Sequence, residues 1–218
     1  MDIKKHSYLL ELIVVFIGLF LAFTLDRMWD NYKTGVAEEN YLNGFLKDIT
    51  SDHNDLDSSL VGYKYNVNRL RNIINMAGTD GIPQDTLLPL AALMGSQSKF
   101  VPQRITYETL TASGSLSIIS DYELRQKIAE LYTKYNSILF IEETFNKYIS
   151  ENVFPFLQNN FDFMDNSLID KNLGKNPVFK NMTMFYYSIY KAKLENLTQV
   201  KIIAEEVLEL LQKELDIN

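Results

Sequence analysis

The first quarter of the chain contains two hydrophobic patterns in succession, and the first is apolar on every helical face. Residues 7–25 contain a single charged side chain, Glu11. At about 1.5 Å per residue this helix would be roughly 28 Å long, close to the ~30 Å hydrocarbon core of a bilayer. Tyr8 lies at one end, and Trp29 and Tyr32 lie just beyond the other, where membrane proteins place interfacial aromatic anchors. The pattern predicts a transmembrane helix, preceded by a short tail of residues 1–6.

Two other interpretations fit an apolar N-terminal segment. A cleaved signal peptide needs small residues at its cleavage site, and the nearest candidate, Ala22-Phe23-Thr24, fits poorly. A core helix of a soluble protein is rarely apolar on all faces. Lys and Arg are equally numerous on the two flanks, and only the density of Lys4 and Lys5 favours a cytoplasmic N-terminus. We therefore expect an uncleaved single span with the body outside the cytoplasm.

One face of the predicted span combines an acid with small residues. Glu11, Gly18 and Ala22 fall on the same side of a helix. Small residues four positions apart allow a second helix to approach closely. A carboxylate is costly in a bilayer unless it lies near headgroups, is protonated or is hydrogen-bonded. The face predicts helix packing against another membrane protein or a second copy. A tolerated interfacial acid beside chance small residues, and a proton-carrying acid, are the alternatives.

After Gly35 the apolar residues become periodic. Their spacing alternates between four and three residues, which indicates a long amphipathic helix with a narrow heptad seam. Gly78 and the turn-forming residues after it predict the end of this helix. The seam residues are Leu42, Leu46, Ile49, His53, Leu56, Leu60, Tyr63, Val67, Leu70 and Ile74.

The rest of the chain predicts further helices separated by turns. Residues 159–176 form a polar stretch with aromatic anchors, and no run of residues alternates as a strand would. Helices can bury their apolar seams only against one another, so we expect an all-α fold. It consists of an N-terminal transmembrane helix, residues 7–25, and an antiparallel helical bundle within residues 26–218.

Local signals place the ends of these helices. Asp85 would cap a helix over 86–94, and Gly114 would end a helix over 105–113. The capping-box spacing of Ser120 and Glu123 predicts the start of the next helix, which Pro155 would end or kink. Asn176 with Pro177 would open a last helix that runs to about Leu215.

Charge and composition narrow the function. Residues 1–25 carry no net charge, because two acids, Asp2 and Glu11, balance two bases, Lys4 and Lys5. The formal net charge of −7 therefore belongs to residues 26–218. An acidic body without basic runs argues against a nucleic-acid partner. The chain of 218 residues has no cysteine and two histidines, without a zinc-type spacing or a glycine-rich phosphate loop. We predict no metal, no cofactor and no enzyme activity.

Two segments together resemble a known family. The first is Glu11-x-x-x-Val15-x-x-Gly18-x-x-x-Ala22, and the second spans residues 106–121. They resemble uncharacterised bacterial membrane proteins, common in Bacteroidota and classed as a domain of unknown function. The resemblance reaches about Tyr132 and implies a membrane-anchored helical protein without supplying an activity. The residues of the second segment that carry it are Tyr107, Glu108, Ser113, Gly114 and Asp121.

These observations favour a non-enzymatic interaction or assembly module of the bacterial inner membrane, with a periplasmic body. It would be an accessory subunit that contacts lipid and other membrane proteins, or a homo-oligomer, through its span. The alternative is an extracytoplasmic sensor that binds a small ligand near Tyr186 and Tyr190. A third hypothesis is a stator-like subunit that uses Glu11.

Overall fold

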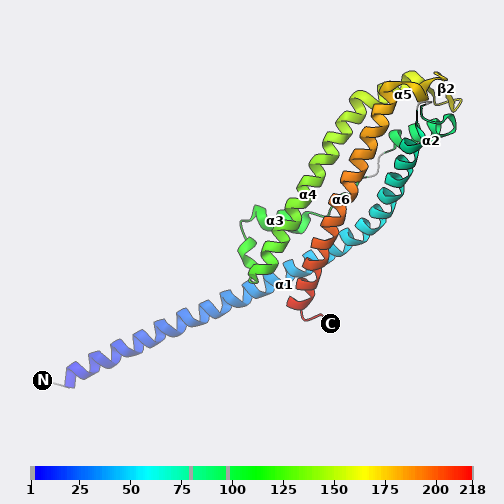
Figure 1. Ribbon diagram of the computed structural model, residues 1–218. Coiled ribbons are helices and arrows are strands. Elements are labelled where there is room, and N and C mark those ends of the chain that lie inside the picture. Colours follow the sequence, from blue (N-terminus) through cyan, green and yellow to red (C-terminus); the bar gives the residue numbers. More distant parts are fainter. Residues whose placement is uncertain (1–2, 79–80, 97–98, 218) are drawn as a thin grey trace.

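The computed structural model describes residues 3–78, 81–96 and 99–217, with side chains from Leu12 onward. Its first element, α1 (Ile3–Met76), is a single helix of 74 residues. The predicted span and the predicted heptad helix are therefore one continuous element, about 110 Å long at ~1.5 Å per residue. Figure 1 shows its N-terminal part as a free arm that leads into a helical body.

The remaining elements fold back along the second half of α1, and the predicted all-α class is confirmed. The two short strands pair antiparallel, with Phe161 opposite Leu168. The elements are α2 (Gln84–Gly95), α3 (Ile105–Ala112), η1 (Leu116–Ile118), α4 (Tyr122–Tyr148), η2 (Ile149–Val153), α5 (Phe154–Asn160), β1 (Phe161–Asp162), β2 (Ser167–Leu168), η3 (Leu173–Lys175) and α6 (Pro177–Glu214).

Three long helices form the bundle, and α6 packs against both α1 and α4. Asp57 pairs with Lys201 and Tyr63 contacts Tyr190, so residue numbers on α6 fall as those on α1 rise. α6 is thus antiparallel to α1, whereas α1 and α4 run in the same direction (Figure 1). α2, α5 and the strands lie at the end of the body far from the free arm, and α3 lies near the arm.

The buried face of α1 shares most of its residues with the predicted seam, and at several of the other seam positions the preceding residue is buried instead. Leu42, Ile49, Leu56, Tyr63, Val67 and Leu70 are buried, whereas Leu46, His53, Leu60 and Ile74 are half-buried. Phe45, Asp52 and Ile73 are buried instead. The reason is that α1 packs against α6 on one side and against α3 with the preceding segment on the other, so its covered face is wider than a two-helix seam.

Two predicted caps are wrong, and one is confirmed. Asp121, not Ser120, caps α4, because its Oδ1 accepts a hydrogen bond from the Leu124 N–H at 2.7 Å. The Ser120 N–H donates instead to Glu38 on α1. Asp85 lies inside the first turn of α2, which begins after Pro83. Asn176 caps α6 as predicted.

Pro155 does not end the helical path. α4 passes through the π-helical turn η2 directly into α5, which contains Pro155 in its first turn. A π turn inserts an extra residue and so relieves the clash that a proline ring makes with the preceding turn.

Candidate functional site

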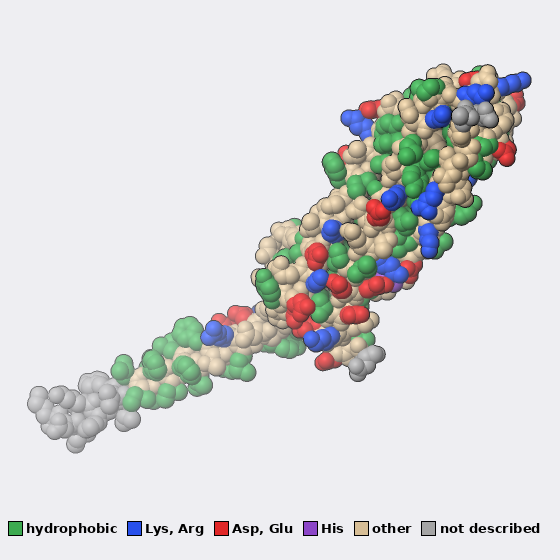
Figure 2. Space-filling model, viewed as in Figure 1, with side chains coloured by type: hydrophobic (Ala, Val, Ile, Leu, Met, Phe, Trp, Pro, Cys, Tyr) green, Lys and Arg blue, Asp and Glu red, His purple; other side chains and the backbone are tan. Residues whose placement is uncertain are grey.

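The free arm of α1 carries the site that the sequence places in the membrane. Every described side chain from residue 12 to residue 36 is exposed. Among the described residues, one helix is long and apolar enough to cross a membrane, and its apolar window lies in this arm, unburied by the body. Figure 2 shows hydrophobic side chains gathered over the arm, where charged ones are sparse. The predicted site residues Tyr8 and Glu11 lie outside the described side chains.

An apolar stripe continues from the predicted span into the segment beyond it, residues 26–36, here called the stalk. At about 100° per residue the stripe positions lie on one helical face. Apart from its chain neighbours and the adjacent backbone of α1, no described atom lies within 4 Å of the position that a Cβ on Gly18 would take, so this face is open. The rings of Trp29 and Tyr32 stack with centroids 5.9 Å apart. We call the following set the stalk stripe: Gly18, Ala22, Leu25, Trp29, Tyr32 and Val36.

The bundle of the same chain does not cover the stalk stripe. The side of the stalk opposite the stripe carries Arg27, Asn31 and Thr34. Phe45 and Ile49, which face the bundle, lie about half a helical turn away from the stripe direction. The apolar face of α1 thus changes sides between the stalk and the body, and the stripe faces away from the chain's own core.

The segment that carries the family resemblance folds as α3, η1 and the start of α4, and its key residues make contacts inside the chain. Tyr107 stacks on Tyr132 at 4.0 Å between ring centroids. Glu108 accepts a hydrogen bond from Arg104 Nε at 2.8 Å. The Ser113 hydroxyl donates to a carbonyl of its own helix. Gly114 has φ +66°, a conformation that favours glycine, and it ends the turn after α3.

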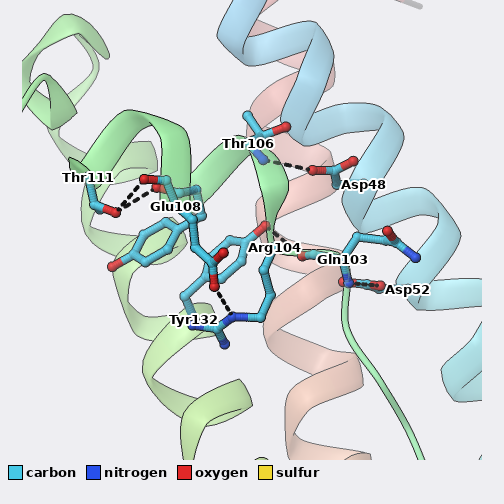
Figure 3. A network of polar contacts seen from close by, with 9 residues as sticks. Asp48, Asp52, Gln103, Arg104, Thr106, Glu108, Thr111 and Tyr132 are labelled. Atoms are coloured by element: carbon cyan, nitrogen blue, oxygen red, sulfur yellow. Dashed lines mark hydrogen bonds and ion pairs between the residues drawn. The ribbon is translucent and has the colours of Figure 1, made fainter. Parts of the chain in front are cut away.

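Two carboxylates of α1 hold the first turn of α3 and the segment that precedes it (Figure 3). Asp52 is fully buried, and its Oδ1 accepts a hydrogen bond from the Gln103 N–H at 2.8 Å. Asp48 Oδ2 accepts from the Thr106 N–H at 3.3 Å. Tyr132 on α4 donates to the Gln103 carbonyl at 3.2 Å. These bonds tie α1, the extended segment and α4 together at the end of the body near the free arm.

The pKa of Asp52 is strongly perturbed. Burial is the main cause, and the charges of Asp48 and Asp55 act in the same direction, so that the pKa is raised from the usual 3.8 to about 6. The Gln103 N–H and the nearby Tyr135 hydroxyl oppose this rise, although Asp52 and Tyr135 do not form a hydrogen bond of good geometry. Burial and Asp52 raise the pKa of Tyr135 in turn. This arrangement links folding stability to protonation.

A second buried polar pair lies further along the bundle. Lys193 on α6 forms an ion pair with Glu142 on α4 at 2.8 Å, and their side chains are only 5% and 8% exposed. The Lys193 ammonium lies 4.2 Å from the ring centroid of Phe145, a favourable cation–π distance. Burial lowers the pKa of Lys193, whereas Glu142 opposes that shift. The pair joins two helices in a low-dielectric core.

Tyr186 and Tyr190, near which the sequence predicts a small-ligand site, lie in the core of the bundle. Both side chains are buried, and the Tyr186 hydroxyl donates to the Met94 carbonyl at 2.7 Å. Phe145 packs edge-on against Tyr186, so aromatic side chains fill the space between the helices.

Sequence reasoning did not identify Asp52, Glu142 or Lys193. A signal was present: Phe45, Ile49, Asp52 and Leu56 also follow a spacing of four, three and four, one residue away from half of the predicted seam. Lys193 likewise lies three residues after Tyr190, on the apolar side of α6. A charged residue at such a position indicates a buried side chain that needs a polar partner elsewhere in the chain.

The described side chains contain no group of three or more histidine, aspartate or glutamate residues arranged to hold a metal ion. Comparison of the chain with protein-family models, with curated proteins and with solved structures finds no match.

Proposed function

We propose that this chain is a non-enzymatic, membrane-anchored helical module that assembles with a partner along the stalk stripe. The anchor is a single span in a bacterial inner membrane, with the N-terminus in the cytoplasm and the body in the periplasm. The partner is a second copy of the chain or another single-span protein. The observation that carries the proposal is the exposed apolar face that runs from the span into the stalk.

Lipid can cover only the first part of this face. Headgroups add roughly 5–7 Å to each side of the hydrocarbon core. Val36 lies 11 residues beyond Leu25, or about 16 Å along a helix at 1.5 Å per residue. Tyr32 and Val36 therefore project into water as exposed apolar side chains. A contiguous exposed apolar surface of this kind marks an interaction site.

The order of residues along the stripe suits a helical partner. Gly18 and Ala22 allow close backbone approach inside the bilayer. From Leu25 at the end of the span outward, Trp29, Tyr32 and Val36 continue the alternation of four and three residues that supports coiled-coil packing. Polar residues occupy the opposite side of the stalk, so a partner would cover one defined face.

Site-specific photo-crosslinking in native membranes tests this function. A benzophenone amino acid replaces Tyr32 or Val36, and the matched controls carry it at Asn31 or Thr34. We expect strong adducts from the stripe positions and weak ones from the controls, with an adduct of twice the 25.2 kDa chain mass if the partner is a second copy. Equal yields from both faces, or no adduct, would contradict the proposal.

A further inference from the structure

A groove lies at the end of the body far from the free arm, between the last turns of α1 and helix α2. It has a volume of about 420 Å³, within the ~300–1,000 Å³ typical of small-molecule sites. Figure 1 shows α2 beside the end of α1, and α2 packs on η2 and η3. The groove is separate from the stalk stripe and from the filled region around Tyr186.

The wall formed by α1 supplies a cation and amide groups. Arg69, Asn68 and Asn72 all line the groove. The Arg69 side chain is half-buried, yet it has no hydrogen-bond or ion-pair partner among the described residues. A guanidinium forms paired hydrogen bonds with a carboxylate, and carboxamides can bind the remaining oxygen lone pairs. This wall therefore suits an anionic group of carboxylate type.

The wall formed by α2 supplies acceptors. Asp85 lies exposed in the first turn of α2 and lines the groove, and its carboxylate has no partner among the described residues. Pro89 lies inside the same helix and also lines the groove. Because proline has no N–H, the Asp85 carbonyl loses its α-helical donor. A carboxylate and a carbonyl without that donor suit an ammonium group, which carries three donors and no acceptor.

The two opposite charges face the groove without pairing with each other. The structure records no ion pair between Arg69 and Asp85, although both belong to the same groove. Tyr65 and Met76, which are exposed and belong to the same wall as Arg69, provide an apolar surface in the groove. The walls are also held in place at the tip, where the Ile82 N–H, just before α2, donates to the Gly174 carbonyl of η3 at 2.9 Å.

We infer that this groove binds a small zwitterion, a free amino acid or short peptide, with its carboxylate on Arg69 and its ammonium on Asp85. An apolar side chain of the ligand packs on Tyr65 and Met76. This inference does not depend on the stalk stripe, so the two proposals succeed or fail separately.

Thermal unfolding of the full chain in detergent, followed by far-UV circular dichroism, tests the site. The probes are the free amino acids and di- and tripeptides of apolar residues at millimolar concentration, each with N-acetylated and C-amidated counterparts. We expect at least one free zwitterion to raise Tm by about 3 °C or more. Its acetylated and amidated counterparts would lose most of the shift, because each lacks one charge.

Matched variants assign the two charges. Arg69→Gln and Asp85→Asn are each expected to abolish the shift. Arg71→Gln is the control, because Arg71 lies on the same helix but contacts Tyr187 instead of the groove. The inference is overturned if no zwitterion shifts the Tm of the unaltered protein, if blocked ligands act equally well, or if Arg69→Gln retains the shift.

Discussion

The stalk and the body half of α1 both carry apolar residues at helical spacing, but those residues are exposed in the stalk and buried in the body. In the stalk, Trp29, Tyr32 and Val36 are exposed apolar side chains. In the body, α1 buries not only leucine and phenylalanine side chains but also the carboxyl of Asp52. The body half finds its partners within the chain, and the stalk half does not. Exposed apolar residues thus mark where a partner is missing, and buried polar ones mark where partners are fixed.

The largest expected effect comes from breaking the buried pair in the body. Glu142→Ala leaves the Lys193 ammonium buried without its counter-charge, which should destabilise the bundle by about 3–5 kcal/mol. Urea unfolding followed by circular dichroism measures this loss. Glu142→Leu combined with Lys193→Met should recover most of the stability, because no charge then remains buried. If Glu142→Ala unfolds like the unaltered protein, the pair does not hold the bundle.

A pH-dependent effect is expected at Asp52. Its folded pKa of about 6 lies above the usual 3.8 of an unfolded carboxyl, so the folded state favours the protonated form. The stability from this group is therefore full below about pH 4 and is lost as pH rises through 6. Asp52→Asn keeps an acceptor for the Gln103 N–H and removes the charge. We expect it to raise stability by about 1–3 kcal/mol at pH 8 and by little at pH 4.

Urea unfolding curves at the two pH values check this sign. Glu39→Gln on the same helix is the control, because Glu39 is exposed and its charge is not among those that raise the pKa of Asp52. A variant at Asp52 that is less stable than the unaltered protein at pH 8 would contradict the predicted charge penalty.

A smaller effect is expected at the helix cap beside the stalk. Asp121→Ala removes the side-chain acceptor for the Leu124 N–H and should cost about 1 kcal/mol. Ser120→Ala should cost much less, because Ser120 bonds to Glu38 through its backbone N–H, which the substitution retains. Thermal unfolding separates the two; equal losses would mean that Asp121 is not the effective cap.

The sequence predicted the helical class because the periodicity of apolar residues and the local signals at Asn176 and Pro177 are properties of neighbouring residues. It did not predict which residues flanking the seam are buried. Whether Asp52 or His53 is buried depends on how α3 and α6, which are distant in sequence, pack against α1. The groove was not predicted for the same reason, since Arg69 and Asp85 belong to different helices joined by a turn.

The central claim is that a partner covers one face of the stalk, and maleimide labelling in native membranes tests it most directly. The chain has no cysteine, so Tyr32→Cys and Val36→Cys on the stripe compare cleanly with Asn31→Cys and Thr34→Cys on the opposite face. The account predicts labelling about tenfold slower on the stripe in membranes, with the difference lost after extraction into dilute detergent. Equal labelling of both faces in native membranes would contradict it.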